Sequence, residues 1–365
     1  MIIIGCDFHP SWQQIAGIDT GTGETEERKL VHANGEAEQF YRKLAGPVRV
    51  GLESSGNSHW FTDMLAEMGH EVWVGDAARI RAKQVRKQKT DRRDAALILD
   101  LLLKNDFPRI WTPSRQERDQ RQLLIHRYKL VTLRARVKNE LQHLALNKGM
   151  QKGRSLWSKE GQKLLLELSL DYWAGVRRQN LLGLLKSMDQ QITVLDQAVK
   201  KAAEENEKAR LLMTQPGVGP ITSLAYVLTL GDVTRFQRGK QVASYLGLIP
   251  TEYSSAGKQR FGSISKQGNR FMRMLLVEAA TVVVRYDPKF RSEYLHRCHQ
   301  KPKAVAKVAA ARKLAIRLFW MLRTHTPYPE VVRIESSSRV ALAGKEPAEA
   351  LIGRSRTQTG VWVFA

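Results

Sequence analysis

The first 78 residues alternate short apolar runs with turn signals, and this pattern constrains the fold more than any other feature of the chain. Three strand candidates, MIIIGCDF, WQQIAGID and TEERKLVHA, are joined by short polar turns. A helix candidate at 35–45, the strand VRVGLE, a helix over 57–68, the strand EVWVGD and a helix from about 78 follow. Strands joined by tight turns pair antiparallel, whereas strands joined through helices pair parallel. The pattern therefore predicts an α/β sheet that starts as an antiparallel meander and continues as β-α-β units.

This strand order is typical of a ribonuclease H-type sheet. In such a sheet, four acidic residues of this chain are expected to come together. Asp7 ends the first predicted strand and Glu53 ends the fourth, while Asp91 and Asp94 lie on one face of a predicted helix. Taken singly, Asp7 is typical of a turn, and Asp91 and Asp94 after Thr90 are typical of a capped helix start. As a set they predict a Mg²⁺ site, because hard oxygen ligands suit this ion and two metals together clamp a phosphodiester.

The charge of the chain predicts a polyanionic partner. The 365 residues contain 59 Lys and Arg against 36 Asp and Glu, a net charge of +23. Residues 79–154 carry +14 and residues 235–323 carry +15, whereas residues 1–78 carry −7. Nucleic acid is the expected partner, and five basic residues beside Asp91 are predicted phosphate contacts, although a solvated face is the alternative for each: Arg86, Lys87, Lys89, Arg92 and Arg93.

Two heptad patterns predict long helices in the middle of the chain. Apolar residues recur at spacings of three and four from Leu130 to Leu144, and again from Leu181 to Val199. The sequence GRSLW at 153–157 predicts a break between the two helices. The heptads are equally compatible with an intramolecular helical hairpin and with a subunit interface.

Glycine, hydroxyl and basic residues gather in the third region. Gly217 and Gly219 flank Val218 between two prolines, which predicts either a phosphate-binding turn or a tight turn alone. Further on, Ser254 and Ser255 lie in a flexible loop, where a hydroxyl is either a phosphate ligand or a nucleophile. The basic residues predicted to contact nucleic acid in and after this loop are Lys258, Arg260, Lys266, Arg270 and Arg273.

Several classes of protein are not supported by the sequence. No apolar run reaches the roughly 18 residues of a membrane helix, so we expect no membrane partner. The start MIIIGCDFHP lacks the basic segment of a signal peptide, and we expect a cytoplasmic protein. Cys6 and Cys298 lie far apart, without the spacing of a zinc site or a disulfide framework.

Six motifs, in this order and spacing, resemble the DEDD transposases of the insertion sequence 110 family. They are GCDFHP, VGLESSGNSHW, KTDRRDA, QPGVGP, ASYLGLIPTEYSSAGK and SISKQGNRFMR, and together they span roughly residues 1–330. The loop of the fifth motif has Ala256 where many relatives have glycine.

The resemblance implies a ribonuclease H-like (RuvC-like) catalytic domain, a coiled-coil segment and a mainly α C-terminal domain with a catalytic serine. It implies that Asp7, Glu53, Asp91 and Asp94 form the carboxylate tetrad and that Ser254 or Ser255 is the nucleophile. It also implies a prokaryotic, nucleoid-associated dimer or tetramer, in which carboxylates of one subunit meet the serine of another. Its expected partners are donor DNA, target DNA and a structured noncoding guide RNA, the bridge RNA.

We therefore predict a recombinase that excises and inserts its own element. The expected division is a catalytic domain at 1–112, a helical segment at 113–210, a C-terminal domain at 211–330 and a mobile tail at 331–365. A Holliday-junction resolvase or another structure-selective nuclease is the alternative among enzymes, since it needs the carboxylates but not the serine. A noncatalytic nucleic-acid-binding protein is the alternative from another class, and it explains the charge but not the tetrad.

Overall fold

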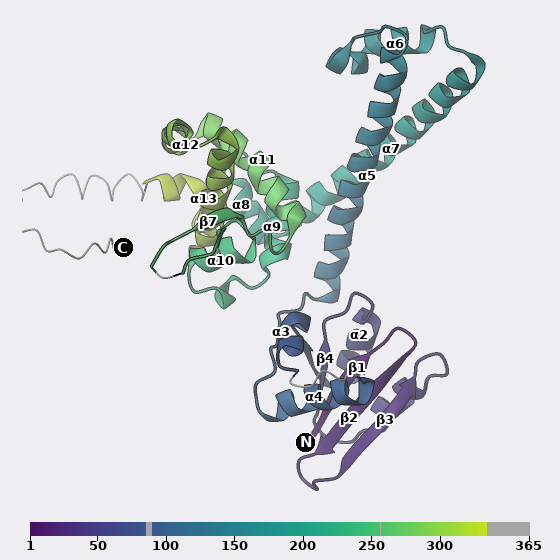
Figure 1. The fold of residues 1–365 in the computed structure, drawn as a ribbon, viewed down its shortest axis with the longest axis vertical. Helices are drawn as coiled ribbons and strands as arrows, with labels where there is room; N and C mark the ends of the chain where they lie inside the picture. The colour runs from purple at the N-terminus through teal and green to yellow at the C-terminus, as the bar shows by residue number, and fades with distance from the viewer. Residues whose placement is uncertain (85–89, 256, 334–365) are drawn as a thin grey trace, which may run out of the picture. The chain divides into compact units, whose positions relative to one another are not determined.

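The computed structural model describes residues 1–84, 90–255 and 257–333. The chain divides into two compact units, Met1–Gln116 and Glu117–Ala365. Figure 1 shows a mixed α/β first unit and a mostly helical second unit. No helix in the described ranges is long and apolar enough to cross a membrane.

The first unit is built on a five-stranded sheet with the strand order β3-β2-β1-β4-β5. The strands β1 (Ile2–Phe8), β2 (Trp12–Asp19) and β3 (Thr25–Val31) pair antiparallel, as their short turns predict. The strands β4 (Val48–Glu53) and β5 (Glu71–Gly75) extend the sheet in parallel pairing on the other side of β1. The charged edge strand β3 discourages further strand pairing at that edge.

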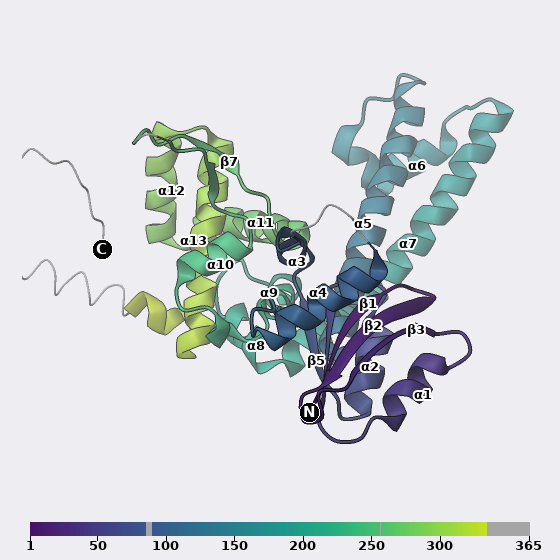
Figure 2. The same cartoon turned by 60° about the horizontal axis from the view of Figure 1, so that its bottom comes forward.

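Helices cover both faces of this sheet (Figure 2). The helices α1 (Glu36–Lys43) and α2 (His59–Glu67) bury Tyr41 and Phe61 against Ile4 and Cys6 of β1. On the opposite face, α4 (Asp91–Leu103) buries Ile98 and Leu102 with Ile3 of β1. The short helix α3 (Ala77–Ala82) follows β5. Because successive strand residues point to opposite faces, Ile3, Gly5 and Asp7 all face α4.

The second unit begins with a long helical hairpin. The helices α5 (Arg115–Leu146) and α7 (Tyr172–Glu205) are connected through a 3₁₀ turn (Gly153–Trp157) and α6 (Lys159–Glu167). Three ion pairs link α5 to α7 in antiparallel order, Arg127–Asp196, Arg134–Asp189 and Glu140–Arg177, and a fourth joins Lys148, just after α5, to Asp171, the N-cap of α7. The two helices thus pair within one chain, the first of the two arrangements that the heptads allow.

The remainder of the second unit is a helical body with one small sheet. It contains α8 (Glu207–Met213), α9 (Pro220–Leu230), a 3₁₀ turn (Val233–Arg235), α10 (Gly239–Tyr245), α11 (Arg270–Tyr286), α12 (Pro288–Gln300) and α13 (Lys303–Thr324). Strands β6 (Pro250–Glu252) and β7 (Phe261–Ile264) form an antiparallel hairpin between α10 and α11. The core includes Leu124 of α5 and Val199 of α7, so the base of the long hairpin belongs to it. Val331 also packs against this core, inside the segment expected to be the tail.

Candidate active site

The end of the sheet positions the first two predicted carboxylates. In the parallel pairing of β1 with β4, Cys6 lies opposite Leu52, and Asp7 and Glu53 are the next residues along each strand. Gly5 and Gly51 also lie opposite each other, and a side chain at either would run into α4. By the alternation of strand residues, Asp7 and Glu53 therefore emerge on the α4 face.

Close packing of α4 on β1 brings the other two carboxylates to the same end of the sheet. A Cβ atom at Gly5 would lie 2.3 Å from the carbonyl oxygen of Ala95 and 2.4 Å from the amide nitrogen of Leu99. Only glycine leaves room for the helix backbone at this distance. The helix begins after Thr90, whose side chain accepts a hydrogen bond from Arg93 N–H, as the N-cap prediction requires. Its first turn carries Asp91 and Asp94.

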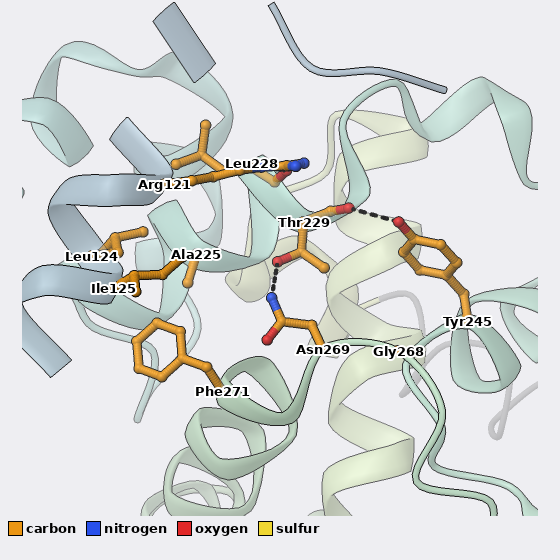
Figure 3. Close-up of a pocket in the computed structure, with 10 residues that line it drawn as sticks. All are labelled: Arg121, Leu124, Ile125, Ala225, Leu228, Thr229, Tyr245, Gly268, Asn269 and Phe271. Atoms are coloured by element: carbon orange, nitrogen blue, oxygen red, sulfur yellow. Dashed lines mark hydrogen bonds between the residues drawn. The ribbon is translucent and has the colours of Figure 1, made fainter. Parts of the chain in front are cut away.

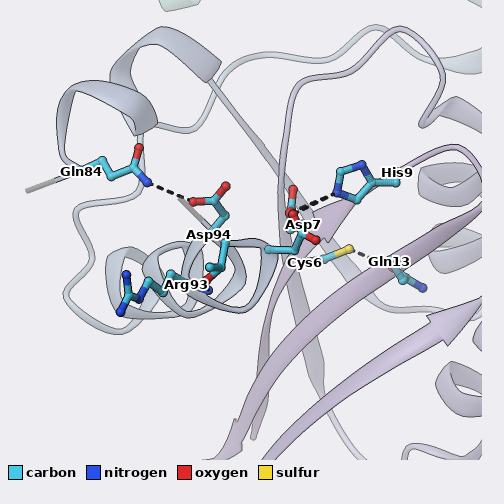
Figure 4. A network of polar contacts seen from close by, with 9 residues as sticks. Cys6, Asp7, His9, Gln13, Gln84, Arg93 and Asp94 are labelled. Carbon is cyan, nitrogen blue, oxygen red and sulfur yellow. Dashed lines mark hydrogen bonds and ion pairs between the residues drawn. The ribbon is translucent and has the colours of Figure 1, made fainter. Parts of the chain in front are cut away.

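His9 joins two of these carboxylates. Its Nε2 lies 3.3 Å from Asp7 Oδ2 (Figure 4). The same nitrogen lies 3.7 Å from Asp91 Oδ1. One potential ligand atom of each of these three residues lies within 4.8 Å of the other two. The imidazole stacks on Trp12 with the ring centroids 4.3 Å apart, and Lys29 Nζ lies 4.0 Å from the indole centroid on which His9 stacks. Within the described ranges, the potential metal ligands that lie close together are thus Asp7, His9 and Asp91. We call these three residues the close group; it contains two of the four predicted carboxylates and adds a histidine.

Electrostatics and hydrogen bonding place Asp94 beside this group. Burial raises the pKa of Asp7, and the carboxylates of Asp94 and Asp91 raise it further, while His9 acts in the opposite direction. Gln84 Nε2 donates a hydrogen bond to Asp94 Oδ1 at 3.1 Å, and Figure 4 shows this pair over the first turn of α4. Half-buried carboxylates that repel one another, with an imidazole nearby, fit a divalent cation.

The other residues predicted around the carboxylates occupy different settings. The Glu53 side chain is exposed at the end of β4, and the close group above does not include it. Arg92 binds Glu27 of β3 through Nε at 3.0 Å, and Arg93 is exposed. Arg86, Lys87 and Lys89 lie outside the described residues.

The predicted serines lie in the connection of the β6–β7 hairpin. Ser254 Oγ donates a hydrogen bond to Glu252 Oε1 at 2.6 Å and accepts one from Arg260 N–H at 3.3 Å. Ser255 forms a backbone bridge with Lys258 across the loop. Both serines, Lys258 and Arg260 are exposed, so all four can meet a large substrate.

The remaining predicted contacts of the second unit differ in exposure. Lys266 and Arg270 are exposed, whereas Arg273 Nη1 donates to the carbonyl oxygens of Leu246 (3.2 Å) and Gln267 and thereby holds the root of the β6–β7 hairpin. Gly217 has a φ of 82°, and a Cβ there would lie 3.0 Å from Ala279 O of α11. The positive φ and the close approach of α11 both favour glycine at this position, as the tight-turn interpretation expects. Gly219 is the N-cap of α9, with open space where a Cβ would be.

Three residues of these surroundings were not predicted from the sequence. His9 follows Asp7 by two positions, just past the end of β1, and this spacing was an available signal. Glu252 similarly precedes Ser254 by two positions in the hairpin. Gln84 carried no comparable signal, because only the packing of its segment brings it to Asp94.

Comparisons with known proteins match both units. A family model described as a transposase, of the DEDD type of IS110, matches residues 4–148, and a second, described as the transposase IS116/IS110/IS902 family, matches residues 209–295. A protein of Pseudomonas aeruginosa named "Probable family 20 transposase" is 28% identical over 333 residues, covering 87% of this chain and 96% of that protein.

Two further relatives carry specific names. The "Transposase for insertion sequence element IS1111A" of Coxiella burnetii is 26% identical, with 78% of each chain covered. The "Pilin gene-inverting protein" of Moraxella bovis is 27% identical, over 66% of this chain and 68% of that protein. With both family models matched in the expected order, the chain belongs to the IS110 family of transposases and is a DNA-recombining enzyme.

Proposed function

We propose that this transposase excises and inserts its element by cutting and rejoining DNA at a Mg²⁺ site formed by Asp7, Glu53, Asp91 and Asp94. The observation that carries the proposal is the convergence of three of these carboxylates and His9 at the end of β1, where their repulsion and burial raise the pKa of Asp7. Such crowding is costly without a cation and favourable with one. The ribonuclease H-like classification is part of the proposal, and the strand order β3-β2-β1-β4-β5 supports it.

The side chains of the site have distinct proposed roles. Divalent cations, if held by these carboxylates, would stabilise the negative charge that develops on a phosphodiester during its cleavage. Asp7 and Asp91 are proposed ligands, and His9 holds their carboxylates in the relative position observed. Gln84 orients Asp94 through its hydrogen bond.

The serine hairpin supplies the proposed nucleophile. The serine oxygen forms a bond to phosphorus while one phosphorus–oxygen bond of the DNA breaks, and the released sugar oxygen takes up a proton. Glu252, 2.6 Å from the Ser254 hydroxyl, is placed to receive the serine proton first. Lys258 and Arg260 provide positive charge near the phosphate oxygens.

The metal-site proposal is tested with Asp7→Asn. We expect this variant to lose strand cleavage and exchange in Mg²⁺ while it retains most of its DNA affinity, since affinity comes mainly from Lys and Arg. The matched control is Asp100→Asn in the same helix as Asp91, because Asp100 pairs with Lys104 and is not among the proposed ligands. Cleavage by Asp7→Asn at a near-normal rate would refute the metal site.

The serine proposal is tested with a nicked DNA substrate that traps a covalent intermediate. We expect a protein–DNA adduct on denaturing gels, with peptide mass spectrometry assigning the modified serine. Ser254→Ala and Ser255→Ala, made singly, separate the nucleophile from its neighbour, and the double variant is expected to lose both adduct and recombination. If the double variant recombines normally, the hairpin only binds phosphate.

We extend the proposal to an oligomer, a dimer or tetramer, guided by a structured noncoding RNA. The two basic blocks and the family support this extension. Sequencing of RNA that copurifies with the protein tests it, and recovery of random cellular RNA alone would count against a dedicated guide.

A further inference from the structure

The second unit contains a cavity of about 320 Å³ that the proposed chemistry does not use. It is bounded by the start of α5, the end of α9, α10 and the first turn of α11, and Figure 3 shows the side chains that line it. Most of its wall is apolar, including Ile125, Ala225 and Phe271. Pockets that bind small ligands commonly have about this size and a mostly apolar lining.

Two aromatic rings offer stacking surfaces to this cavity. Tyr245 is 40% exposed, and Phe271 is partly buried against Tyr128, with the ring centroids 4.8 Å apart. In Figure 3 the rings of Tyr245 and Phe271 lie on opposite sides of Thr229 and Asn269. Aromatic side chains at the surface of a nucleic-acid-binding protein are the usual platforms for unstacked bases.

The polar groups of the cavity are held by long hydrogen bonds. Tyr245 OH donates to Thr229 O at 3.4 Å, and Asn269 Nδ2 donates to Thr229 Oγ1 at 3.4 Å. Bonds of this length are weak, so the Tyr245 hydroxyl can turn to the edge of a base at little cost. The Asn269 amide is fixed more firmly, because its Oδ1 accepts a hydrogen bond from Met272 N–H at 3.1 Å as the N-cap of α11.

One arginine lines this cavity and a second lies close to one of its rings. Arg121 lines the cavity, and its Nε donates a hydrogen bond to Leu228 O at 3.0 Å. The guanidinium carbon of Arg235, Cζ, lies 4.7 Å from the centroid of the Tyr245 ring. Arg235 begins the segment 235–323, which carries +15, and Arg121 belongs to the segment 79–154, which carries +14. A ligand with an aromatic ring next to an anionic phosphate complements both features.

The rim of the cavity is also the root of the serine hairpin. A Cβ at Gly268 would lie 2.2 Å from Tyr245 O, and one at Gly247 would lie 2.2 Å from Gln267 O. Ser265 N–H donates to Ile249 O at 2.8 Å, which closes the two segments that enter and leave the hairpin. A ligand bound against Tyr245 therefore contacts the base of the element that carries Ser254 and Ser255.

We propose that this cavity receives one unstacked nucleobase of the DNA strand handled by the serine hairpin. The choice of DNA rests on the proposed function of the hairpin, whereas base insertion itself rests on the cavity, its rings and its charge. Holding one base fixes the register of the strand at the root of the hairpin, which positions a phosphate a short distance along it.

The test uses full-length protein and single-stranded DNA that carries 2-aminopurine at one position, which is moved along the strand. Binding is followed without divalent cation, so no cleavage is needed. We expect one position to change its fluorescence strongly on binding, because a base that leaves its stacked neighbours alters its emission. The same response is expected from Asp7→Asn protein, which separates this inference from a failure of the metal site.

Two variants and one control locate the response. Phe271→Ala is expected to weaken binding of the strand by about 5- to 150-fold through lost stacking, while Tyr286→Ala, at the exposed far end of α11, leaves affinity unchanged. Ala225→Met fills the cavity and is expected to abolish the position-specific fluorescence change while the salt dependence of binding persists. Thermal melts identify any variant that fails to fold. If a variant does fail, the scan of 2-aminopurine positions with the unmodified protein still tests the proposal.

Three results would overturn the proposal. They are a fluorescence change of equal size at every position, an unchanged response in folded Ala225→Met protein, and a response to RNA of the same sequence without one to DNA.

Discussion

At the residue scale, a glycine decides whether the carboxylates can meet. Gly5 carries no chemistry, yet its missing side chain lets α4 approach β1 until Asp91 and Asp94 stand beside Asp7. His9 has the complementary role, because its ring occupies the space between two carboxylates. The candidate site thus depends on one residue that leaves space and one that fills it.

We predict that Gly5→Ala impairs both folding and DNA cleavage. The new methyl group meets backbone atoms of Ala95 and Leu99, which cannot rotate away, so α4 must shift at a cost of about 1–3 kcal/mol in the free energy of unfolding. Urea unfolding and a cleavage assay measure the two effects. Gly17→Ala on the neighbouring strand is the control, since its Cβ would lie 3.4 Å from Ile4 Cγ1, an ordinary contact. Equal stability of the two variants would show that α4 packs more loosely on β1 than the contacts at Gly5 indicate.

At the scale of elements, a buried ion pair joins two helices of the second unit. Asp287 accepts a hydrogen bond from Phe290 N–H at the start of α12 and binds Arg317 Nη1 of α13 at 2.6 Å. Both side chains are 5% exposed. Burial alone would raise the pKa of Asp287, but the Phe290 N–H and the Arg317 guanidinium together lower it below its usual value.

We predict that Asp287→Ala destabilises the second unit by about 3–5 kcal/mol at pH 7, because Arg317 is left buried without its counter-charge. The pKa of Asp287 is lower in the folded than in the unfolded protein, so its stabilisation is present above the unfolded pKa of about 3.9 and is lost as pH falls through the folded pKa. The difference in stability between the two proteins should therefore shrink below about pH 4.

Unfolding curves at pH 7, 5 and 3 measure this difference. Asp232→Ala, an exposed N-cap, is the control and should cost only about 1 kcal/mol. An effect of Asp287→Ala no larger than that of the control would mean that Arg317 finds another partner.

At the scale of the whole molecule, charge is distributed to suit a long polyanion. Segments of +14 and +15 lie in the first and second halves of the chain, and the acidic opening segment of −7 holds two of the proposed metal ligands. The other two proposed ligands, Asp91 and Asp94, lie within the +14 segment, so this segment would contribute both to the metal site and to binding of the DNA backbone.

We predict that DNA binding weakens steeply with salt. Each phosphate neutralised on duplex DNA contributes about −0.9 to the slope of log K against log salt. Fluorescence anisotropy between 50 and 200 mM salt, roughly the range over which such proteins lose most affinity, measures the slope. Asp7→Asn should leave the slope unchanged, whereas Lys258→Ala with Arg260→Ala should reduce it by about two units. An affinity that hardly varies with salt would contradict backbone binding by the basic segments.

Local pattern was enough to predict most of the elements. Alternating apolar residues predicted the five strands of the first sheet, and Thr90 before Asp91 predicted the start of α4. These features depend on residues close together in sequence, where periodicity and capping act directly. The chemical types of the acidic residues and serines, with their order, also sufficed to indicate the family.

The tertiary structure alone decided which side chains meet. The pairing of His9 with Asp91, the hydrogen bond from Gln84 to Asp94, and the cavity shared by Arg121 and Asn269 join segments separated by 10 to 148 positions. Periodicity states which face of an element is buried, but not which residue of another element lies opposite. That choice is made by close packing, as when α4 settles onto Gly5, and packing is a property of the whole fold.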